Sequence, residues 1–216
     1  MTIVERRRVP ATGKAKVKTS RVLDSNVCLD IEPVTFAELW RNYVPGKPHG
    51  NLNYKNQCAI RLSATLHRVG VPMKSFSEKY VPKMPGKQRL GRDLLNGKPV
   101  ALRAYEMATW LKQKRQFCGL PDAPQNITGS EWETKIRGRT GIVYFFGYWQ
   151  QEGDSAGTLT GGHIDLWNGA RLTISSPLGA AATLGRWAGL REFIPSWEYG
   201  YSDLGASTEI LFWEIK

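Results

Sequence analysis

The fold expected of this chain depends on two stretches, Asn-Gln-Cys-Ala-Ile-Arg-Leu-Ser at residues 56–63 and Gly-His-Ile-Asp-Leu-Trp-Asn-Gly at residues 162–169. The first indicates a cysteine, Cys58, at the start of a helix that follows a polar, glycine-rich loop. The second indicates a histidine, His163, on a strand that enters a tight turn. A thiol at the positive end of a helix, with an imidazole brought to it by the fold, is an arrangement for nucleophilic attack on an amide. A cysteine peptidase or amidase is therefore the leading hypothesis.

Helical signals dominate the first half of the chain. The Thr-x-x-Glu pattern at residues 35–38 has the form of a capping box, so we expect a helix that runs from there through Tyr43. A second helix is expected over about residues 57–68, with Gly70 just past its end. A third fits residues 100–112, where apolar side chains recur at helical spacing.

Strand signals dominate after residue 141. The run at 142–146 is continuously apolar, as expected of a strand buried on both faces. Asn168-Gly169 is a strong hairpin signal, and residues 150–161 form a polar, glycine-rich loop. Residues 180–190 could form a further short helix. The expected strands cover residues 142–146, 163–167, 171–175 and 209–215. Helices first and an antiparallel sheet second indicate an α+β domain.

Length and charge indicate one globular domain with a basic arm. A chain of 216 residues, 41% of them hydrophobic, is long enough to bury a core. The net charge of +11 is unevenly spread, because residues 1–21 carry seven basic side chains against Glu5 alone. We therefore expect a flexible basic arm over residues 1–30 and a single domain over residues 31–216. Such an arm can bind a polyanion, although a solvated terminus is the commoner outcome.

Targeting signals and metal-binding patterns are absent from the sequence. Residues 1–8 are polar and no apolar run follows them, so neither a secretory signal nor a membrane span is expected. The three cysteines form neither a disulfide framework nor a metal cluster, and no cofactor is expected. With Cys58 kept as a free thiol, Cys28 and Cys118 remain. They could pair in an oxidising compartment, but we expect two buried thiols.

The surroundings of Cys58 favour a nucleophile over a small buried side chain, which is the usual role of a single cysteine on a helix. The first helical turn offers unpaired N–H groups and the helix dipole, and both stabilise a thiolate. Asn56 and Gln57 place amide donors beside the backbone N–H of Cys58. These donors suit an oxyanion hole, and we assign Gln57 to it.

The candidate general base follows by elimination, because the chain has only three histidines. His67 lies nine residues after Cys58 on the same expected helix, half a turn out of phase at about 100° per residue, so it points away from the thiol. His49 lies in the preceding loop, where it would be poorly fixed. His163 lies on a strand, in a rigid setting. A histidine half-buried on a sheet face is its alternative, but together with Cys58 it is the favoured base.

These motifs resemble one known family, the type VI secretion amidase effectors of family 4. The resemblance rests on the stretches around Cys58 and His163, the Gly-Ile-Val-Tyr-Phe strand at 141–145 and the Ile-Leu-Phe-Trp ending at 210–213, and it covers roughly residues 35–216. It implies a papain-like, NlpC-related core in which N-terminal helices pack on an antiparallel sheet. It also implies a cysteine amidase that cuts the D-glutamyl–meso-diaminopimelate bond of peptidoglycan.

The same resemblance implies partners and a route for the protein. A cognate immunity protein would protect the producing cell, and a component of the type VI secretion apparatus would carry the effector. The protein would be made in the bacterial cytoplasm, leave without a signal peptide and act in the periplasm of a target cell.

The sequence departs from the family at the third catalytic position. The family places an aspartate eleven residues after the histidine, and this chain has Ile174 there. With a two-residue turn at Asn168-Gly169, Trp167 would pair with Ala170 and His163 would face Ile174. The expected orienting carboxylate is therefore missing from the facing strand.

Asp165 is the candidate replacement for that aspartate. It lies two residues after His163 on the same strand face and could accept the second imidazole N–H, so we assign it this role. A solvated strand carboxylate is the alternative. Ser175 would face His163 only if the turn were one residue longer.

Two other functions compete with a wall hydrolase. A nucleic-acid-binding module would use the basic arm and exposed aromatic side chains, for which Trp110, Trp149 and Trp187 are the candidates. The concentration of charge in a tail and the lack of a recognised motif argue against it, so we expect no nucleic-acid partner. A papain-like hydrolase or deamidase acting on a protein would use the same nucleophile and base, and only a panel of substrates separates it from a wall hydrolase.

Overall fold

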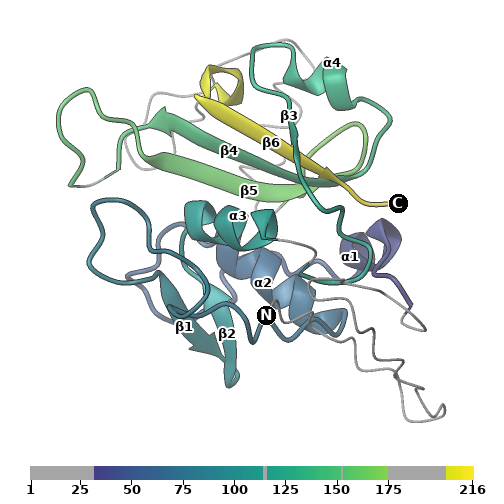
Figure 1. The fold of residues 1–216 in the computed structure, drawn as a ribbon, viewed down its shortest axis with the longest axis horizontal. Helices are drawn as coiled ribbons and strands as arrows, with labels where there is room; N and C mark the ends of the chain where they lie inside the picture. The colour runs from purple at the N-terminus through teal and green to yellow at the C-terminus, as the bar shows by residue number, and fades with distance from the viewer. Residues whose placement is uncertain (1–31, 114–115, 152, 175–202) are drawn as a thin grey trace, which may run out of the picture.

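The computed structural model describes residues 32–113, 116–151, 153–174 and 203–216. The predicted arm over residues 1–30, the candidate helix at 180–190, Ser175 and Trp187 lie outside these residues. The described elements follow the order α1 (Phe36–Arg41), α2 (Cys58–Arg68), β1 (Arg92–Leu95), β2 (Lys98–Ala101), α3 (Ala104–Lys112), β3 (Gln125–Asn126), α4 (Trp132–Ile136), β4 (Gly141–Trp149), β5 (Gly161–Trp167), the 3-10 turn η1 (Leu204–Ala206) and β6 (Glu209–Glu214). The predicted α+β class is confirmed, with helices mainly before the sheet (Figure 1).

The sheet is antiparallel and four-stranded, in the order β3-β6-β4-β5. Strand β4 lies inside it and pairs with β5 on one side and β6 on the other. Its residues 141–145 are all buried, which confirms the prediction of a strand covered on both faces. Among the described strands, β5, which carries His163, forms an edge of this sheet.

The helices agree with the sequence in two of three cases. The predicted capping box of α1 is present, with Thr35 and Glu38 bonded to each other's backbone N–H, but the helix ends at Arg41 because Asn42 caps it through the Glu38 carbonyl. Helix α2 matches its predicted range. Gly70 follows it with a φ of 87° and donates to the His67 carbonyl, as predicted for the residue after a helix end.

The third predicted helix is wrong in its first turn. Residues 98–101 form β2, which pairs with β1 in a hairpin, and α3 begins only at Ala104. The sequence contains the signal for this hairpin, because Asn96 and Gly97 both adopt positive φ, of 52° and 72°, in the two-residue turn. The hairpin was not predicted because the apolar residues Val100 and Ala101 continue the helical spacing of the apolar residues in α3.

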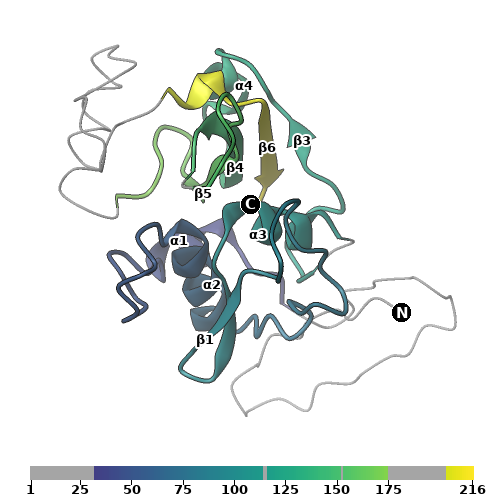
Figure 2. The same cartoon turned by 90° about the vertical axis from the view of Figure 1, so that its left-hand side faces the viewer.

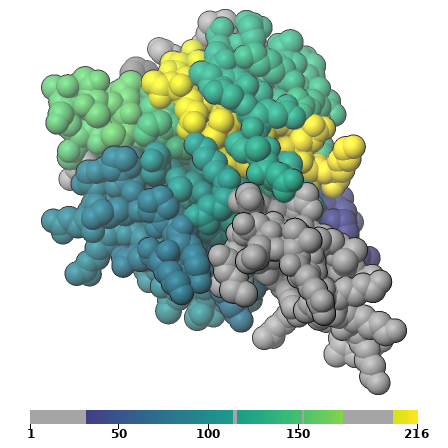
Figure 3. Space-filling model, viewed as in Figure 1, coloured from purple at the N-terminus to yellow at the C-terminus, as the bar shows by residue number. Residues whose placement is uncertain are grey.

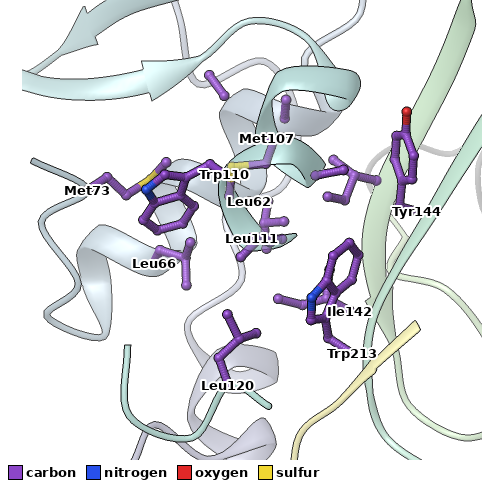
Figure 4. Packing of buried hydrophobic residues seen from close by; sticks show 14 of the residues in the cluster. Leu62, Leu66, Met73, Met107, Trp110, Leu111, Leu120, Ile142, Tyr144 and Trp213 are labelled. Atoms are coloured by element: carbon purple, nitrogen blue, oxygen red, sulfur yellow. The ribbon is translucent and has the colours of Figure 1, made fainter. Parts of the chain in front are cut away.

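The hydrophobic core fills the space between the helical layer and one face of the sheet (Figure 4). Side chains from β4 and β6 meet side chains from α2 and α3 there; they include Ile142, Tyr144 and Trp213 opposite Leu62, Leu66, Met107 and Leu111. Each fully buried large apolar side chain contributes roughly 1.5–3 kcal/mol to folding. This packing fixes the position of α2 relative to the sheet.

The opposite face of the sheet packs on α4, in a second cluster. The Trp132 ring stands edge-on to the Phe145 ring, with centroids 4.8 Å apart. In the view turned by 90°, α1, α2 and α3 lie on one side of the sheet and α4 on the other (Figure 2). In the space-filling view, the light-green and yellow segments of the chain lie above the blue segments (Figure 3). The sheet is thus the middle layer.

A buried carboxylate holds the loop before β1 against α3. Glu106 is fully buried and accepts hydrogen bonds from the N–H of Met84 at 3.0 Å, the N–H of Gly91 at 2.8 Å and the guanidinium of Arg103 at 2.8 Å. Buried N–H groups that lose their acceptor are costly to the folded state. The Glu106 side chain therefore stabilises this loop through contacts that no apolar residue can replace.

We expect Glu106→Ala to lower the free energy of unfolding by about 2–4 kcal/mol, because two buried backbone N–H groups would lose their partner. Urea denaturation followed by tryptophan fluorescence measures the change. Glu78→Ala, at an exposed position, is the control and should change stability by less than about 0.5 kcal/mol. Equal stability of the two variants would contradict this account of Glu106.

Candidate active site

Cys58 is the first residue of α2, and only 8% of its surface is exposed. The preceding residue, Gln57, is the N-cap but makes no side-chain cap to the helix. The backbone N–H groups of the first turn have no acceptor within the helix, and the N-cap side chain does not supply one. The Cys58 side chain belongs to the core cluster shared by α2, α3 and the sheet. The candidate nucleophile is a free thiol at a positive helix end, set into the core.

His163 lies on β5, opposite Phe145 of β4, with 24% of its side chain exposed. The fold brings it to Cys58, and the two side chains form a hydrogen bond. Asp165, two residues along β5, places Oδ2 3.4 Å from Nε2 of His163. The structure thus brings together the three side chains that sequence analysis assigned to catalysis.

The thiol of Cys58 is acidic despite its burial. Burial raises its pKa, but a hydrogen bond with His163, the positive charges of His163 and Arg61, and a hydrogen bond with the backbone of Ile164 lower it further, so that the pKa is about 7. This is well below the ordinary value for cysteine. A large share of Cys58 is therefore thiolate at neutral pH.

The imidazole of His163 is correspondingly basic. Burial lowers its pKa, but hydrogen bonds with Asp165 and Cys58 and the negative charges of both raise it more, to about 9. Because the pKa of the thiol is lowered and the pKa of the imidazole is raised, each mainly by the other partner and by Asp165 or Arg61, the ion pair of thiolate and imidazolium is favoured around neutral pH. This is the reactive state of a thiol nucleophile with an adjacent acid.

Asp165 is held on its other oxygen. Its side chain is 6% exposed, and Oδ1 accepts the N–H of Leu166 at 2.8 Å and the hydroxyl of Thr173. The alternative of a solvated strand carboxylate is therefore wrong. Asp165 is buried, hydrogen-bonded and directed at the imidazole.

The turn after β5 differs from the prediction. Trp167 bridges to Leu172 instead of Ala170, because the turn is longer than two residues. The side chain of Asn168 causes the difference, since its Oδ1 accepts the N–H of Ala170 at 3.1 Å and of Arg171 at 2.9 Å and so stabilises a wider loop.

This register also overturns the predicted neighbour of His163. Counting from the Trp167–Leu172 bridge, Ile174 falls opposite Asp165 rather than His163. Ile174 is 40% exposed, and its neighbour Thr173 supplies the contact to Asp165. The position of the family aspartate is therefore displaced from the imidazole in this chain.

Gln57 does not have the predicted geometry of an oxyanion donor. Its amide nitrogen donates to the carbonyls of His49 at 3.0 Å and Tyr54 at 3.2 Å, and its oxygen accepts the N–H of His49. Both amide hydrogens are therefore used within the loop before α2. The side chain fixes that loop, and the unpaired donor beside the thiol is the backbone N–H of Cys58.

The other two histidines are engaged elsewhere. His49 lies 3.4 Å from the Asp93 carboxylate and packs on the Tyr54 ring. Burial, followed by the charge of Lys98, lowers the pKa of His67 to about 4, so His67 is neutral near the far end of α2. Neither contacts Cys58, which agrees with the choice of His163.

Cys118 corrects the cysteine prediction. It is disulfide-bonded, not a buried thiol, and Cys28 lies outside the described residues. Within the described residues, no group of three or more His, Cys, Asp or Glu side chains could hold a metal ion. In that same part of the chain, no helix has the length and apolar character to cross a membrane.

Sequence reasoning missed three residues near this site. Tyr43 and Thr173 are hydrogen-bonded to each other, and Arg61 donates to the Tyr43 hydroxyl at 3.1 Å. Arg61 had a usable signal, because it follows Cys58 by three residues and so lies near the same helix face. Tyr43 and Thr173 had none, since their positions depend on the packing of distant segments.

Comparison with known proteins identifies a family model that matches residues 54–213, described as type VI secretion system amidase effector protein 4, Tae4. No curated protein matches the chain. Among solved structures, the type VI effector Tae4 from Enterobacter cloacae is 19% identical, with a TM-score of 0.48 over 86% of this chain and 98% of that one. Tae4 from Salmonella typhimurium, in complex with the immunity protein Tai4 from Enterobacter cloacae, is 17% identical, with a TM-score of 0.47 over 85% and 99%.

We expect the alkylation of Cys58 by iodoacetamide to rise with pH around a midpoint near 7, because only the thiolate reacts. In His163→Ala the midpoint should move upward, since burial would then raise the thiol pKa without the imidazole to oppose it. Peptide mass spectrometry after timed labelling measures the rate at Cys58. His67→Ala is the control and should leave the midpoint in place. An unshifted midpoint in His163→Ala would contradict the thiol–imidazole contact.

Proposed function

Because this chain belongs to the type VI secretion amidase effector family 4, we propose that it hydrolyses the D-glutamyl–meso-diaminopimelate amide of peptidoglycan through Cys58 and His163. The observation that carries this proposal is the hydrogen bond between a thiol of pKa about 7 and an imidazole of pKa about 9, with Asp165 behind the imidazole. A nucleophile, a base and an orienting group in that order form a hydrolytic triad.

Two bond exchanges accomplish the reaction. The Cys58 thiolate attacks the amide carbonyl, and the tetrahedral intermediate collapses to a thioester as the His163 imidazolium gives its proton to the leaving amine. Neutral His163 then takes a proton from a water molecule, which attacks the thioester. Release of the carboxylic acid returns the thiolate, and His163 keeps the proton from water, so the starting ion pair is restored.

The developing oxyanion would lie at the start of α2. The backbone N–H of Cys58 is the donor nearest the sulfur, and the helix dipole adds to its effect. Gln57 contributes indirectly, because its contacts with His49 and Tyr54 fix the loop that leads into the helix. In this proposal Gln57 supports the loop and does not itself donate to the oxyanion, contrary to what the sequence had indicated.

The charge of the protein suits the proposed substrate. Carboxylates flank the D-glutamyl–diaminopimelate link, and a chain with a net charge of +11 attracts such a polymer. We also propose that residues 31–216 form a single domain and that the basic side chains within residues 1–30 add to this attraction. Trp110 is fully buried, which removes one of the aromatic side chains on which a nucleic-acid-binding function would depend.

Membership of the family supports a proposal for delivery and protection. Solved relatives include complexes of Tae4 with the immunity protein Tai4, and we propose that a cognate immunity protein protects the cell that makes this chain. A component of the secretion apparatus would carry it from the cytoplasm to the periplasm of a target cell. The disulfide of Cys118 supports an oxidising site of action, because disulfides persist there and are rare in the cytosol.

Digestion of diaminopimelate-type sacculi tests the substrate. We expect wild-type protein to release muropeptides whose stems end at D-glutamate, identified by mass spectrometry. Cys58→Ala should release none, while His67→Ala should match the wild type because His67 is remote and neutral. Intact stems with wild-type protein would contradict the proposal. Deamidation or cleavage of a protein panel by the same preparation would then identify a protein substrate.

Asp165→Asn tests the orienting role. The amide keeps the size of the carboxylate but removes its charge, so the imidazolium loses stabilisation and we expect kcat to fall by about 100-fold or more. KM for a soluble stem peptide should change little, because Asp165 is buried beneath the imidazole. Steady-state kinetics on the purified variant, with circular dichroism to check folding, provide the measurement. Wild-type kcat in this variant would remove Asp165 from the mechanism.

A further inference from the structure

We propose that Arg61, Tyr43 and Thr173 are positioning residues, which hold the Asp165 carboxylate in the rotation that orients His163. This inference rests on the proposed Cys58–His163 chemistry and deepens it. Three side chains outside the proposed triad would thus fix the orientation of Asp165, the third residue of the triad.

The four side chains form one continuous run of hydrogen bonds. Nε of Arg61 donates to the Tyr43 hydroxyl at 3.1 Å, the Tyr43 and Thr173 hydroxyls are bonded to each other, and the Thr173 hydroxyl donates to Oδ1 of Asp165. A guanidinium lies at one end and a carboxylate at the other. Hydrogen bonds in such a run polarise one another and gain strength.

The direction of the protons at both ends of this run is fixed by chemistry. A guanidinium has no acceptor, so Tyr43 must accept from Arg61. A carboxylate has no proton, so Thr173 must donate its hydrogen to Asp165. Burial, and then the charge of Asp165, raise the pKa of Tyr43, so its hydroxyl stays protonated.

As a result, the two carboxylate oxygens of Asp165 have different partners. Oδ1 receives both the Thr173 hydroxyl and the N–H of Leu166, while Oδ2 is left 3.4 Å from Nε2 of His163. Two bonds on one oxygen restrict rotation of the carboxylate. With Nε2 directed at Asp165, the other imidazole nitrogen, Nδ1, is the one left for the thiol.

Arg61 has the position expected of a residue that serves the site. It lies one helical turn after Cys58 on α2, and its Nη1 donates to the carbonyl of Gly46 at 3.2 Å. Among the described residues, no carboxylate forms an ion pair with it, and the groups that raise its pKa against burial are Tyr43, Cys58 and Asp165. Its charge therefore stabilises the thiolate and the carboxylate together.

Thr173→Val and Tyr43→Phe each remove one hydroxyl and keep the shape of the side chain. With a soluble stem peptide as substrate, we expect kcat to fall between about 10-fold and 100-fold in either variant, because a hydrogen bond to a charged group is lost. KM should stay nearly constant. The pH midpoint for alkylation of Cys58 should move upward, since a loosely held Asp165 stabilises the imidazolium, and through it the thiolate, less well. Thr173→Ser should restore both kcat and the midpoint.

Matched controls separate positioning from simple loss of a hydroxyl. Thr109→Val removes a half-buried hydroxyl that donates only to the Tyr105 carbonyl within α3, and Tyr80→Phe removes a partly buried phenol hydroxyl outside the described site. Both should keep wild-type kcat and labelling midpoint. If Thr173→Val is too unstable to purify, kcat and the labelling midpoint of Tyr43→Phe test the inference.

A lower melting temperature with wild-type kcat and midpoint in both test variants would overturn the inference. The labelling measurement needs no substrate, so it also tests the network if the stem peptide is not cleaved. A stem peptide that wild-type protein leaves intact would count against the proposed function, whereas an upward midpoint in Thr173→Val and Tyr43→Phe would still support the network.

Discussion

The contact between the start of α2 and strand β5 is the constraint on which the candidate site depends. The Cys58 thiol lies within the same core cluster as Leu62 and Leu66, so hydrophobic packing, rather than a loop, fixes the position of the proposed nucleophile. The backbone of Ile164, next to His163, contributes a hydrogen bond to the sulfur. The helix and the strand cannot shift against each other without disrupting the core, and this rigidity gives a constant distance between thiol and imidazole.

Burial of Cys58 and His163 disfavours their charged forms, and neighbouring charged groups offset this cost. Burial opposes the charged form of both Cys58 and His163, yet each is pushed toward its charged form by the other and by Asp165 or Arg61. Such groups are stable only as a set, because removing one leaves an unpaired charge in a poorly solvated place. The ionised state of the Cys58 thiol therefore depends on His163, Asp165 and Arg61 together.

The sequence predicted the parts of the structure that local rules govern. The capping box at Thr35, the glycine just past the end of α2 at Gly70 and the apolar run of β4 each follow from a few adjacent residues, and each is present. The pairing of Cys58 with His163 followed from the scarcity of histidines and from the family motifs. The count of histidines and the family motifs both indicated His163, because the chain offers only three histidines as a base for the thiol.

The failures have physical reasons that no local pattern contains. Gln57 has the right chemistry for an oxyanion hole, but the carbonyls of the preceding loop compete for its two hydrogens. The β1–β2 hairpin was masked by apolar residues that fit a helix equally well. Tyr43 and Thr173 reach the site only through tertiary packing, so their spacing in the chain carries no information about their contact.

The wide turn after β5 bears on how relatives of this chain should be compared. Position by position, Ile174 would be scored as a lost catalytic carboxylate and the chain as a dead enzyme. In space, a carboxylate from the histidine's own strand occupies the place behind the imidazole, and the facing segment supplies a hydroxyl to hold it. A comparison made position by position therefore misses this carboxylate, because it lies two residues after the histidine on the same strand and not eleven residues later.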